Sequence, residues 1–395
     1  MRLLLVQSAV FLPTYGGASK ANRILCELLA SRGHECFVFA VAEQYIDNPD
    51  AITTYCDRIR AEGAEILFQD SSMVMFRNAM VTVFAFTNTT ELRSEVALHL
   101  PGLRPDVVLI SSEDPFQVLL TKLAPLCGEK LVYFAHTSIF LPFGPNSVYP
   151  NSAAAETFGH IAGIVTISRY MKQYFEDWIH VSPKQIAVPI FGQEPFPNFA
   201  QYDSGSVAMI NPCAIKGLPI FLELARRFPN FPFSAVRGWG TTDHDVRELN
   251  SLPNISLLGS KTEIDLILSH TRILLVPSLW QEGFGLVAVE AMLRGIPVLA
   301  SNTGGLAEAK LGVDYVIPVR AITTYLPQHD EKMIPRAVVP AQDIGPWQNA
   351  LSDLLTLSER YFQVSADSRN AALRYVQSCD IATVETQLLS MVLNR

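Results

Sequence analysis

The chain has 395 residues and a formal net charge of −8, from 30 Lys and Arg set against 38 Asp and Glu. Hydrophobic residues make up 49% of it and charged residues 17%, which excludes disorder for most of its length. The sequence contains no block of Lys and Arg, which argues against a duplex nucleic-acid binder. No apolar run reaches the roughly 18 residues that cross a bilayer, so we expect a soluble protein of two domains.

Strand-length apolar runs alternate with longer amphipathic stretches in the first half, which is typical of βαβ units in a mainly parallel sheet. Strands are predicted at residues 3–7, 36–40, 81–86, 107–111, 131–135 and 164–167. The first run leads directly into a Gly-Gly turn, so we expect a buried strand there and not a signal peptide. The clearest helix is predicted at 18–31, followed by Gly33 as a left-handed cap.

The pattern is interrupted by a stretch rich in Pro and Gly at 188–206, which we interpret as a hinge, and it then resumes. Strands are predicted at residues 207–211, 233–237, 255–258, 273–276, 298–301 and 315–318. Residues 318–346 carry several prolines and are expected to form a surface excursion, and helices are predicted at 347–358, 360–377 and 381–393. Two similarly wound halves predict a cleft, with ligand loops at the carboxyl ends of strands.

The six cysteines form no CxxC pair and no His/Cys ladder at zinc spacing. We therefore expect reduced thiols and a cytoplasmic location.

The strongest local motif spans residues 277–292, where a buried strand ends at Pro277 and a helix is predicted to open near Gly285. Free backbone N–H groups at such a helix start favour a phosphate. Glu290 falls inside this helix among apolar residues, so its carboxylate needs a partner. The hydroxyls of a ribose would satisfy it, and a salt bridge or cap elsewhere would do so equally well. Glu282 precedes the helix, where it either accepts hydrogen bonds from sugar hydroxyls or is a solvated loop acid.

Other polar residues follow predicted strands. Gly16-Gly17 permits the close approach of an anion or sugar, although a plain tight turn explains it as often, and neither GxGxxG nor GxxxxGK[ST] is present. Lys216 is placed to neutralise a diphosphate, or is a solvated loop lysine, and Arg237 adds a second cation at the same edge. His136 is either a core histidine or a sugar contact.

Two acidic groups have competing interpretations. Glu113-Asp114 follows a strand and would meet an acceptor or cap a helix. Asp243-His244-Asp245 matches a metal-diphosphate DxD, but we favour the first turn of a helix for it.

Together these elements resemble glycosyltransferase family 4, the retaining, metal-independent enzymes of the GT-B fold. The resemblance covers nearly the whole chain, and its most specific part is the E-x7-E element from Glu282 to Glu290, followed by residues 295–298 and 301–308. It implies an α/β fold of two Rossmann-like, doubly wound parallel-sheet domains facing a central cleft. The expected domains are 1–195 on the acceptor side and 206–375 for the nucleotide sugar, with helix 376–395 packing back on the first domain.

The resemblance also implies roles for individual residues. Lys216 would stabilise the leaving phosphate, Glu282 would hold the transferred sugar, and His136 would contact that sugar, with Arg237 as a further catalytic cation. The implied donor-binding residues are Gly16, Gly17, Asn211, Leu258, Lys261, Gly283, Phe284, Gly285, Leu286, Val287 and Glu290. One departure is Asn211, where the family usually has an arginine: either Arg237 supplies that charge or the leaving group is less stabilised.

The implied function is transfer of a hexose from a nucleotide sugar, a UDP-sugar in preference to a GDP-sugar, to an acceptor hydroxyl. No cofactor and no metal are expected. A soluble glycan or small natural product is the preferred acceptor, and a lipid-linked acceptor with peripheral membrane contact is the alternative. A catalytically degenerate binding or partner subunit is a second hypothesis, which Asn211 favours. A Rossmann-type oxidoreductase is disfavoured because GxGxxG is absent.

Overall fold

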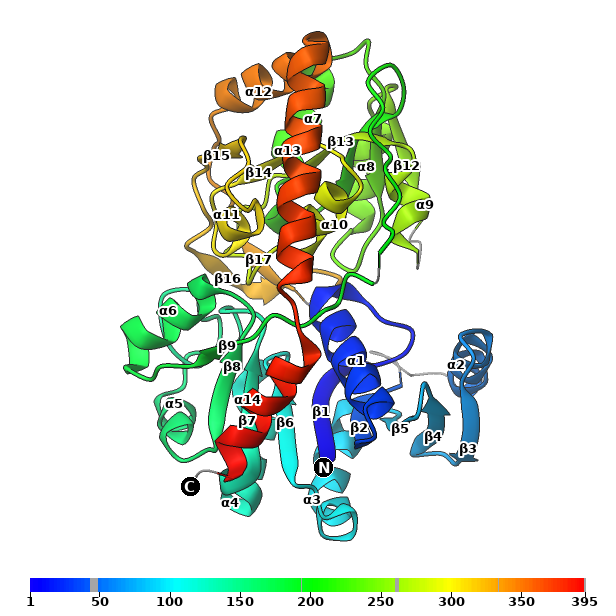
Figure 1. The fold of residues 1–395 in the computed structure, drawn as a ribbon, viewed down its shortest axis with the longest axis vertical. Helices are drawn as coiled ribbons and strands as arrows, with labels where there is room; N and C mark the ends of the chain where they lie inside the picture. Colours follow the sequence, from blue (N-terminus) through cyan, green and yellow to red (C-terminus); the bar gives the residue numbers. More distant parts are fainter. Residues whose placement is uncertain (43–48, 193, 260–262, 333, 394–395) are drawn as a thin grey trace. The chain divides into compact units, whose positions relative to one another are not determined.

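The computed structural model describes residues 1–42, 49–192, 194–259, 263–332 and 334–393 (Figure 1). The chain divides into two compact units, of which the first holds residues 1–190 and 379–395 and the second residues 191–378. Residues 191–195, expected in the first domain, residues 196–205, expected between the domains, and residues 376–378, expected in the last segment, fall in the second unit. In the described part of the chain, no helix has the length and apolar character that a membrane span requires.

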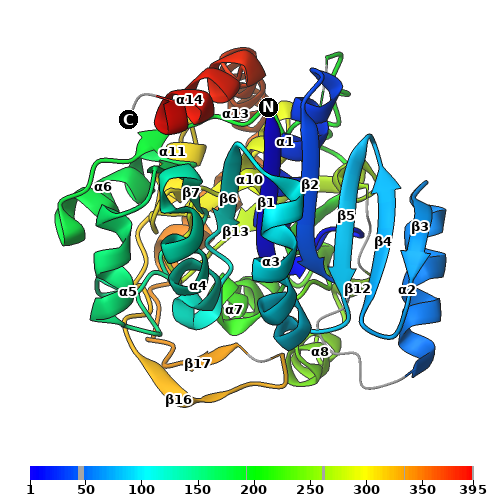
Figure 2. The ribbon, with the colours of Figure 1, turned by 90° about the horizontal axis from the view of Figure 1, so that it is seen from below.

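The first unit is built on a nine-stranded sheet of order β3-β4-β5-β2-β1-β6-β7-β8-β9. Its strands are β1 (Arg2–Val10), β2 (Glu35–Val41), β3 (Glu65–Gln69), β4 (Met73–Asn78), β5 (Val81–Phe86), β6 (Val107–Ser111), β7 (Leu131–Ala135), β8 (Gly163–Thr166) and β9 (Lys184–Gln185). Every pairing is parallel except those of β4 with β3 and β5. Because β1 lies between β2 and β6, the strand order reverses there, which makes its carboxyl end a topological switch point (Figure 2).

Helices cover both faces of this sheet. They are α1 (Gly16–Ser31), α2 (Pro49–Ala61), α3 (Thr89–Leu103), α4 (Val118–Cys127), α5 (Ser152–Glu156), α6 (Arg169–Ile179) and α14 (Ile381–Leu393). Helices α1 and α14 contact each other on one face, and α3 and α4 contact each other on the opposite face, as right-handed crossovers require. Helix α1 ends as predicted, with Gly33 at φ 89° and the amide N–H groups of Gly33 and His34 donating back to Ala30 and Leu29.

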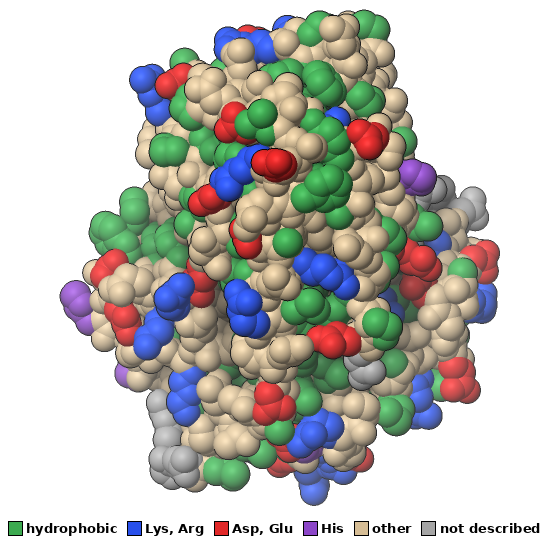
Figure 3. Space-filling view, turned by 45° about the horizontal axis from the view of Figure 1, so that its top comes forward, with side chains coloured by type: hydrophobic (Ala, Val, Ile, Leu, Met, Phe, Trp, Pro, Cys, Tyr) green, Lys and Arg blue, Asp and Glu red, His purple; other side chains and the backbone are tan. Residues whose placement is uncertain are grey.

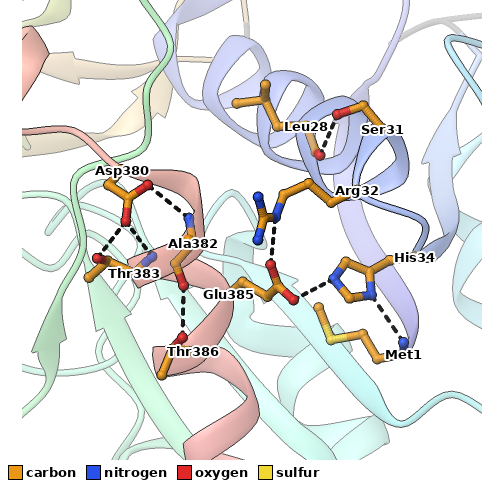
Figure 4. A network of polar contacts seen from close by, with 10 residues as sticks. All are labelled: Met1, Leu28, Ser31, Arg32, His34, Asp380, Ala382, Thr383, Glu385 and Thr386. Atoms are coloured by element: carbon orange, nitrogen blue, oxygen red, sulfur yellow. Dashed lines mark hydrogen bonds and ion pairs between the residues drawn. The ribbon is translucent and has the colours of Figure 1, made fainter.

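The last helix, α14, is anchored in the first unit by a polar network (Figure 4). Glu385 accepts from Arg32 Nε at 2.6 Å and lies 2.9 Å from His34 Nε2, whose ring is 3.0 Å from the Met1 amino group. The hydrogen bond from Arg32 holds the pKa of Glu385 below its usual range. Asp380 caps the helix by accepting from the backbone N–H of the residues two and three positions later. This network fixes α14 beside the end of α1.

The second unit has a six-stranded, fully parallel sheet of order β12-β11-β10-β13-β14-β15. Its strands are β10 (Ser206–Ile210), β11 (Phe233–Val236), β12 (Ile255–Leu258), β13 (Thr271–Val276), β14 (Val298–Ser301) and β15 (Val316–Ile317). Its helices are α7 (Leu218–Arg227), α8 (Asp243–Asn250), α9 (Ile264–Leu268), α10 (Leu286–Leu293), α11 (Leu306–Ala309), α12 (Gly345–Thr356) and α13 (Ser358–Gln377). The strand order reverses between β10 and β13, so the loops after these two strands are neighbours.

The structure differs from the predicted elements in several short or exposed strands and at the end of one predicted strand. Strands β3, β4 and β9 were not predicted, since β3 is largely exposed and β9 has two residues. The excursion at 318–346 contains an antiparallel hairpin of β16 (Tyr325–His329) and β17 (Pro335–Ala337), in which Tyr325 pairs with Ala337. The strand predicted at 207–211 ends one residue early because Asn211 adopts φ 59°.

The surface carries both signs of charge. On the face seen in Figure 3, Lys and Arg side chains alternate with Asp and Glu and form no continuous basic area. That face offers no electrostatic track for a nucleic acid backbone.

Candidate active site

The loops that follow β10 and β13 are bound to each other. The backbone N–H groups of Leu279 and Trp280 both donate to the carbonyl of Ile215, at 2.9 and 3.2 Å. Gly217 has φ 87°, and a Cβ at this position would lie 1.9 Å from the carbonyl oxygen of Pro277. The close approach of the two loops therefore requires glycine here.

This approach brings Lys216 and Glu282 together. Lys216 Nζ lies 2.6 Å from Glu282 Oε1, and their side chains are 18% and 12% exposed. The Ser278 hydroxyl also donates to Glu282. Burial raises the pKa of Glu282, but Lys216 and the hydrogen bonds outweigh it, so the pKa falls below its usual range. The carboxylate is ionised at neutral pH and held opposite an ammonium.

Two tryptophans flank the ammonium. The Lys216 Nζ atom lies 4.3 Å from the ring centroid of Trp280 and 5.8 Å from that of Trp239. Aromatic faces attract a cation and shield it from water, which strengthens its field. Neither tryptophan was predicted as a site residue, although each stands in a short loop directly after a buried strand.

A third loop supports this pair. The hydroxyls of Ser301 and Thr303 donate to the carbonyl of Ser278, at 2.6 and 3.1 Å. The backbone N–H of Gly305 donates to the carbonyl of Glu282 at 2.7 Å. These bonds hold the residues around Glu282 in one conformation, which pre-organises the loop.

Helix α10 begins directly after this loop. Its N-cap is Gly285, at φ 111°, and no side chain caps the helix or places an acid in its first turn. The stretch predicted to bind through its backbone lies in this linker and first turn, namely Gly283, Phe284, Gly285, Leu286 and Val287. An uncapped helix start carries partial positive charge and suits an anion.

Glu290 lies in the second turn of α10 and is 7% exposed. The nearby cation Arg294 donates from Nη1 to the backbone carbonyl of Glu290 at 3.3 Å, and its Nε binds Asp265 at 2.7 Å. A ribose contact for Glu290 remains a prediction.

Asn211 ties the end of β10 to the loop after β11. Its Oδ1 accepts from the backbone N–H of Gly240 at 2.8 Å, and its buried Nδ2 has no partner among the described residues. Its left-handed backbone is one that Asn tolerates well. Asn211 is thus fully enclosed, at 6% exposed, and supports the loop that carries Trp239.

The remaining second-unit residues lie further along the same edge. Arg237 follows β11, is exposed, and its Nη2 lies 3.8 Å from Asp243 at the start of α8. Leu258 ends β12 and is 40% exposed. Lys261, expected beside it, lies outside the described residues.

The DxD element is the start of a helix, as favoured from the sequence. Asp245 accepts from both the backbone N–H and the hydroxyl of Thr242, at 2.8 and 2.7 Å, and forms a capping box. His244, Asp245 and Glu248 lie close enough to share an ion, and the cap engages Oδ2 of Asp245. The expectation that no metal is needed stays a prediction.

The first unit carries a second group of predicted residues at the carboxyl edge of its sheet. Gly16 and Gly17 open α1, whose first turn has no side-chain cap and no acid. His136 follows β7, is 5% exposed, and its backbone N–H donates to the Ser112 hydroxyl at 2.8 Å. The predicted residues of this unit therefore follow β1 and β7, on either side of β6.

The ring of His136 is part of a buried polar chain. Its Nε2 lies 2.8 Å from Asn22 Oδ1, and Asn22 Nδ2 donates to Gln7 Oε1 at 2.8 Å. Gln7 in turn donates to the carbonyl of Ala9 at 3.1 Å. Because the Asn22 oxygen can only accept, the proton belongs on Nε2. Asn22 and Gln7 were not predicted, although polar residues within apolar segments are a usable signal.

Burial lowers the pKa of His136 to about 3. The imidazole is therefore neutral at physiological pH, and its Nδ1 is an acceptor without a partner among the described residues. A neutral histidine can orient a hydroxyl but cannot supply positive charge.

The two acids after β6 have separate roles. Asp114 accepts from the backbone N–H groups of Leu119 and Leu120, at 2.8 and 3.1 Å, so it caps α4. Glu113 has Ser19 of α1 as its hydrogen-bond partner. Burial raises the pKa of both acids to about 7.

Two family models match the chain. The model of Glycosyltransferase Family 4 matches residues 15–188, and the model of Glycosyl transferases group 1 matches residues 241–311. A 41.2 kDa protein in the cps region of Klebsiella pneumoniae is 42% identical over 71 residues, which are 18% of this chain. The aligned stretch spans only 20% of that relative's length.

Solved structures match over the full length. Sucrose-phosphate synthase from Thermosynechococcus elongatus has a TM-score of 0.71 at 14% identity, covering 100% of this chain and 99% of that one. HepE from Anabaena, solved in complex with UDP-glucose, has a TM-score of 0.66 at 15% identity, with both chains covered completely. These likenesses show the fold, and the family models match both units. The chain belongs to the family-4 type of glycosyltransferases, with the GT-B fold of two Rossmann-like domains.

Proposed function

We propose that the chain is a retaining, metal-independent glycosyltransferase that moves a hexose from a nucleotide sugar to an acceptor hydroxyl. The observation that carries the proposal is the buried pair of Lys216 and Glu282 beside the uncapped start of α10. An ammonium and free helix N–H groups stabilise a departing diphosphate, and a carboxylate binds sugar hydroxyls.

The proposed reaction uses these charges to stabilise the leaving group. The bond between the anomeric carbon and the diphosphate oxygen breaks, and a bond to the acceptor oxygen forms on the same face. The acceptor proton passes to the departing phosphate oxygen, so atoms and charge balance without a metal. Lys216 and the helix start absorb the charge that develops on the diphosphate, while Glu282 holds the sugar and Glu290 the ribose. In the first unit, neutral His136 offers Nδ1 as a hydrogen-bond acceptor for a substrate hydroxyl.

The donor class is a UDP-sugar. The structural likeness to HepE, which was solved with UDP-glucose, supports a uracil nucleotide and a hexose. The acceptor is a soluble glycan or small natural product, and the reaction takes place in the cytoplasm. A lipid-linked acceptor is the alternative.

A second candidate is a non-catalytic binding subunit of the same fold. Asn211, buried and bound to Gly240, replaces a cation that would assist the leaving group. Release of UDP that depends on donor and acceptor distinguishes an enzyme from such a subunit.

The donor site is tested by calorimetric titration of the full chain with UDP, GDP, ADP and dTDP in EDTA. We expect UDP to bind at micromolar affinity, and the signal to disappear in Glu290→Ala. Glu359→Ala, which removes an exposed acid from the first turn of α13, is the matched control and should bind normally.

Other outcomes change the proposal in defined ways. Binding of none of the four nucleotides would contradict it and favour the non-catalytic subunit. Binding that needs a divalent cation would assign a metal role to Asp243 and Asp245. Binding of GDP in place of UDP would change the donor class.

A further inference from the structure

The carboxyl edge of the first unit's sheet carries a row of aromatic side chains that the proposed reaction does not use. Phe116 lies in the short turn after β6, and Phe140 and Tyr149 lie in the loop after β7. The ring centroids of Phe116 and Tyr149 are 4.0 Å apart, and those of Tyr149 and Phe140 are 6.2 Å apart with planes 10° from parallel. Phe116, at the end of the row, is 58% exposed.

A hollow of about 380 Å³ adjoins this row. It is lined by Phe116, Gln117, Tyr149, Pro150, Asn151 and Ser152. Hollows of this size hold small ligands. Its lining combines aromatic rings with amide and hydroxyl groups and includes no charged side chain. That combination suits a neutral ligand with an apolar face and a polar rim.

The backbone beside the hollow is held in an uncommon conformation. Phe116 and Gln117 have φ 64° and 54°, the left-handed region that residues other than glycine rarely adopt. Gln117 maintains it by donating from Nε2 to the carbonyl of Phe140 at 2.7 Å and from its backbone to that of Asp114 at 2.9 Å. The conformation leaves the Phe116 ring exposed while Gln117 is completely buried.

Gln117 lies beneath the hollow. It is completely buried, and its Oε1 has no partner among the described residues. The polar groups that the hollow presents to a ligand are those of the exposed Asn151 and Ser152.

We propose that this hollow binds a saccharide ring of the acceptor. The C–H face of a pyranose carries partial positive charge and stacks on the negative face of an aromatic ring such as Phe116. Its hydroxyl rim meets the exposed amide of Asn151 and the exposed hydroxyl of Ser152. The subsite rests on the proposed transferase function and selects a glycan from the acceptor classes considered above.

The test uses saturation-transfer NMR on the full chain with the methyl α- and β-glycosides of glucose, galactose and mannose. We expect transfer to the ring C–H protons of at least one glycoside. Phe116→Ala should reduce it by about threefold or more, the loss of one stacking contact, and Phe116→Tyr should retain it. Trp178→Ala, which removes an aromatic ring of α6 that is 51% exposed, should have no effect.

Three results would overturn the subsite: no transfer to any glycoside, equal transfer in Phe116→Ala, or binding of phenol at this hollow in place of the glycosides. Calorimetry with UDP on the same variants separates this inference from the transferase proposal. UDP binding without a Phe116 effect rejects the subsite alone. Glycoside binding without binding of UDP, GDP, ADP or dTDP rejects the transferase and leaves a saccharide-binding site.

Discussion

The two sheets end in sites of opposite electrostatic character, although each site lies where the strand order reverses. In the second unit, Lys216 and Glu282 form a charged pair between loops that touch. In the first unit, an uncharged hydrogen-bonded chain runs from His136 through Asn22 to Gln7. The same backbone topology therefore supports a site that stabilises charge and one that orients hydroxyls, and the side chains decide which.

The largest expected effect is on the charged site. Lys216→Ala should lower turnover of a UDP-sugar by about 100- to 1000-fold, because it removes a cation that stabilises the leaving group. Steady-state release of UDP measures this. Lys172→Ala, on exposed α6, should be normal, and a loss below about tenfold would mean that Lys216 is not a catalytic cation.

The contact between the loops after β10 and β13 should be sensitive to any side chain at Gly217. Gly217→Ala places a Cβ against the Pro277 carbonyl and should destabilise the second unit by roughly 3 kcal/mol, as measured by urea unfolding. The control is Gly312→Ala, also at positive φ (82°) but with no atom within 4 Å, which should cost about 1 kcal/mol. Equal losses would show that backbone strain alone matters at Gly217.

The first unit should lose stability as pH rises through the pKa of Asp114. Burial raises this pKa to about 7, so the folded state holds a proton that the unfolded chain releases near pH 4. The stability contribution is present at low pH and falls between pH 4 and 7, by up to about 1.4 kcal/mol per pH unit. In Asp114→Asn the slope of melting temperature against pH should fall by about half, because the pKa of Glu113 is raised to about 7 as well. An unchanged slope would assign it to Glu113.

Asn22→Asp turns the neutral chain into a charged one. A carboxylate beside Nε2 favours the imidazolium, so the pKa of His136 should rise from about 3. An NMR titration of the ring nitrogens detects the shift, and Asn22→Ala serves as the uncharged comparison. If the pKa of His136 is unchanged in Asn22→Asp, the hydrogen bond to residue 22 does not control the protonation of the ring.

Arg237 should give the smallest effect. Its side chain is exposed, and its ion pair with Asp243 is long, at 3.8 Å. Arg237→Gln should therefore change the free energy of unfolding by less than about 0.5 kcal/mol. We expect Arg237→Gln to weaken UDP binding about threefold, because the variant loses the attraction between the guanidinium and the diphosphate. Unchanged affinity at low ionic strength would mean that Arg237 does not compensate for Asn211.

Local patterns predicted most of the fold. Buried parallel strands such as β6 and β7 are short apolar runs that end in polar residues, and their bounds match the prediction. Strand β3 was missed because its apolar run is only three residues long, and the hairpin of β16 and β17 was missed because its strands contain few apolar residues. For the site, the motif around Glu282 predicted the loop and the helix start after Gly285.

What the sequence determined by itself is the βαβ pattern, the glycine-rich loop before α10 and the polar residues at strand ends, because each is a local property of spacing and side-chain type. Tertiary structure decided which of these residues meet. Lys216 and Glu282 are 66 positions apart and join because β10 and β13 are adjacent in the sheet. His136 is neutral because the folded chain buries it, and its Nε2–H donates to Asn22, 114 positions away. Contacts between distant residues and the burial of side chains exist only in the packed chain. They make the Lys216–Glu282 site charged and the His136 site neutral.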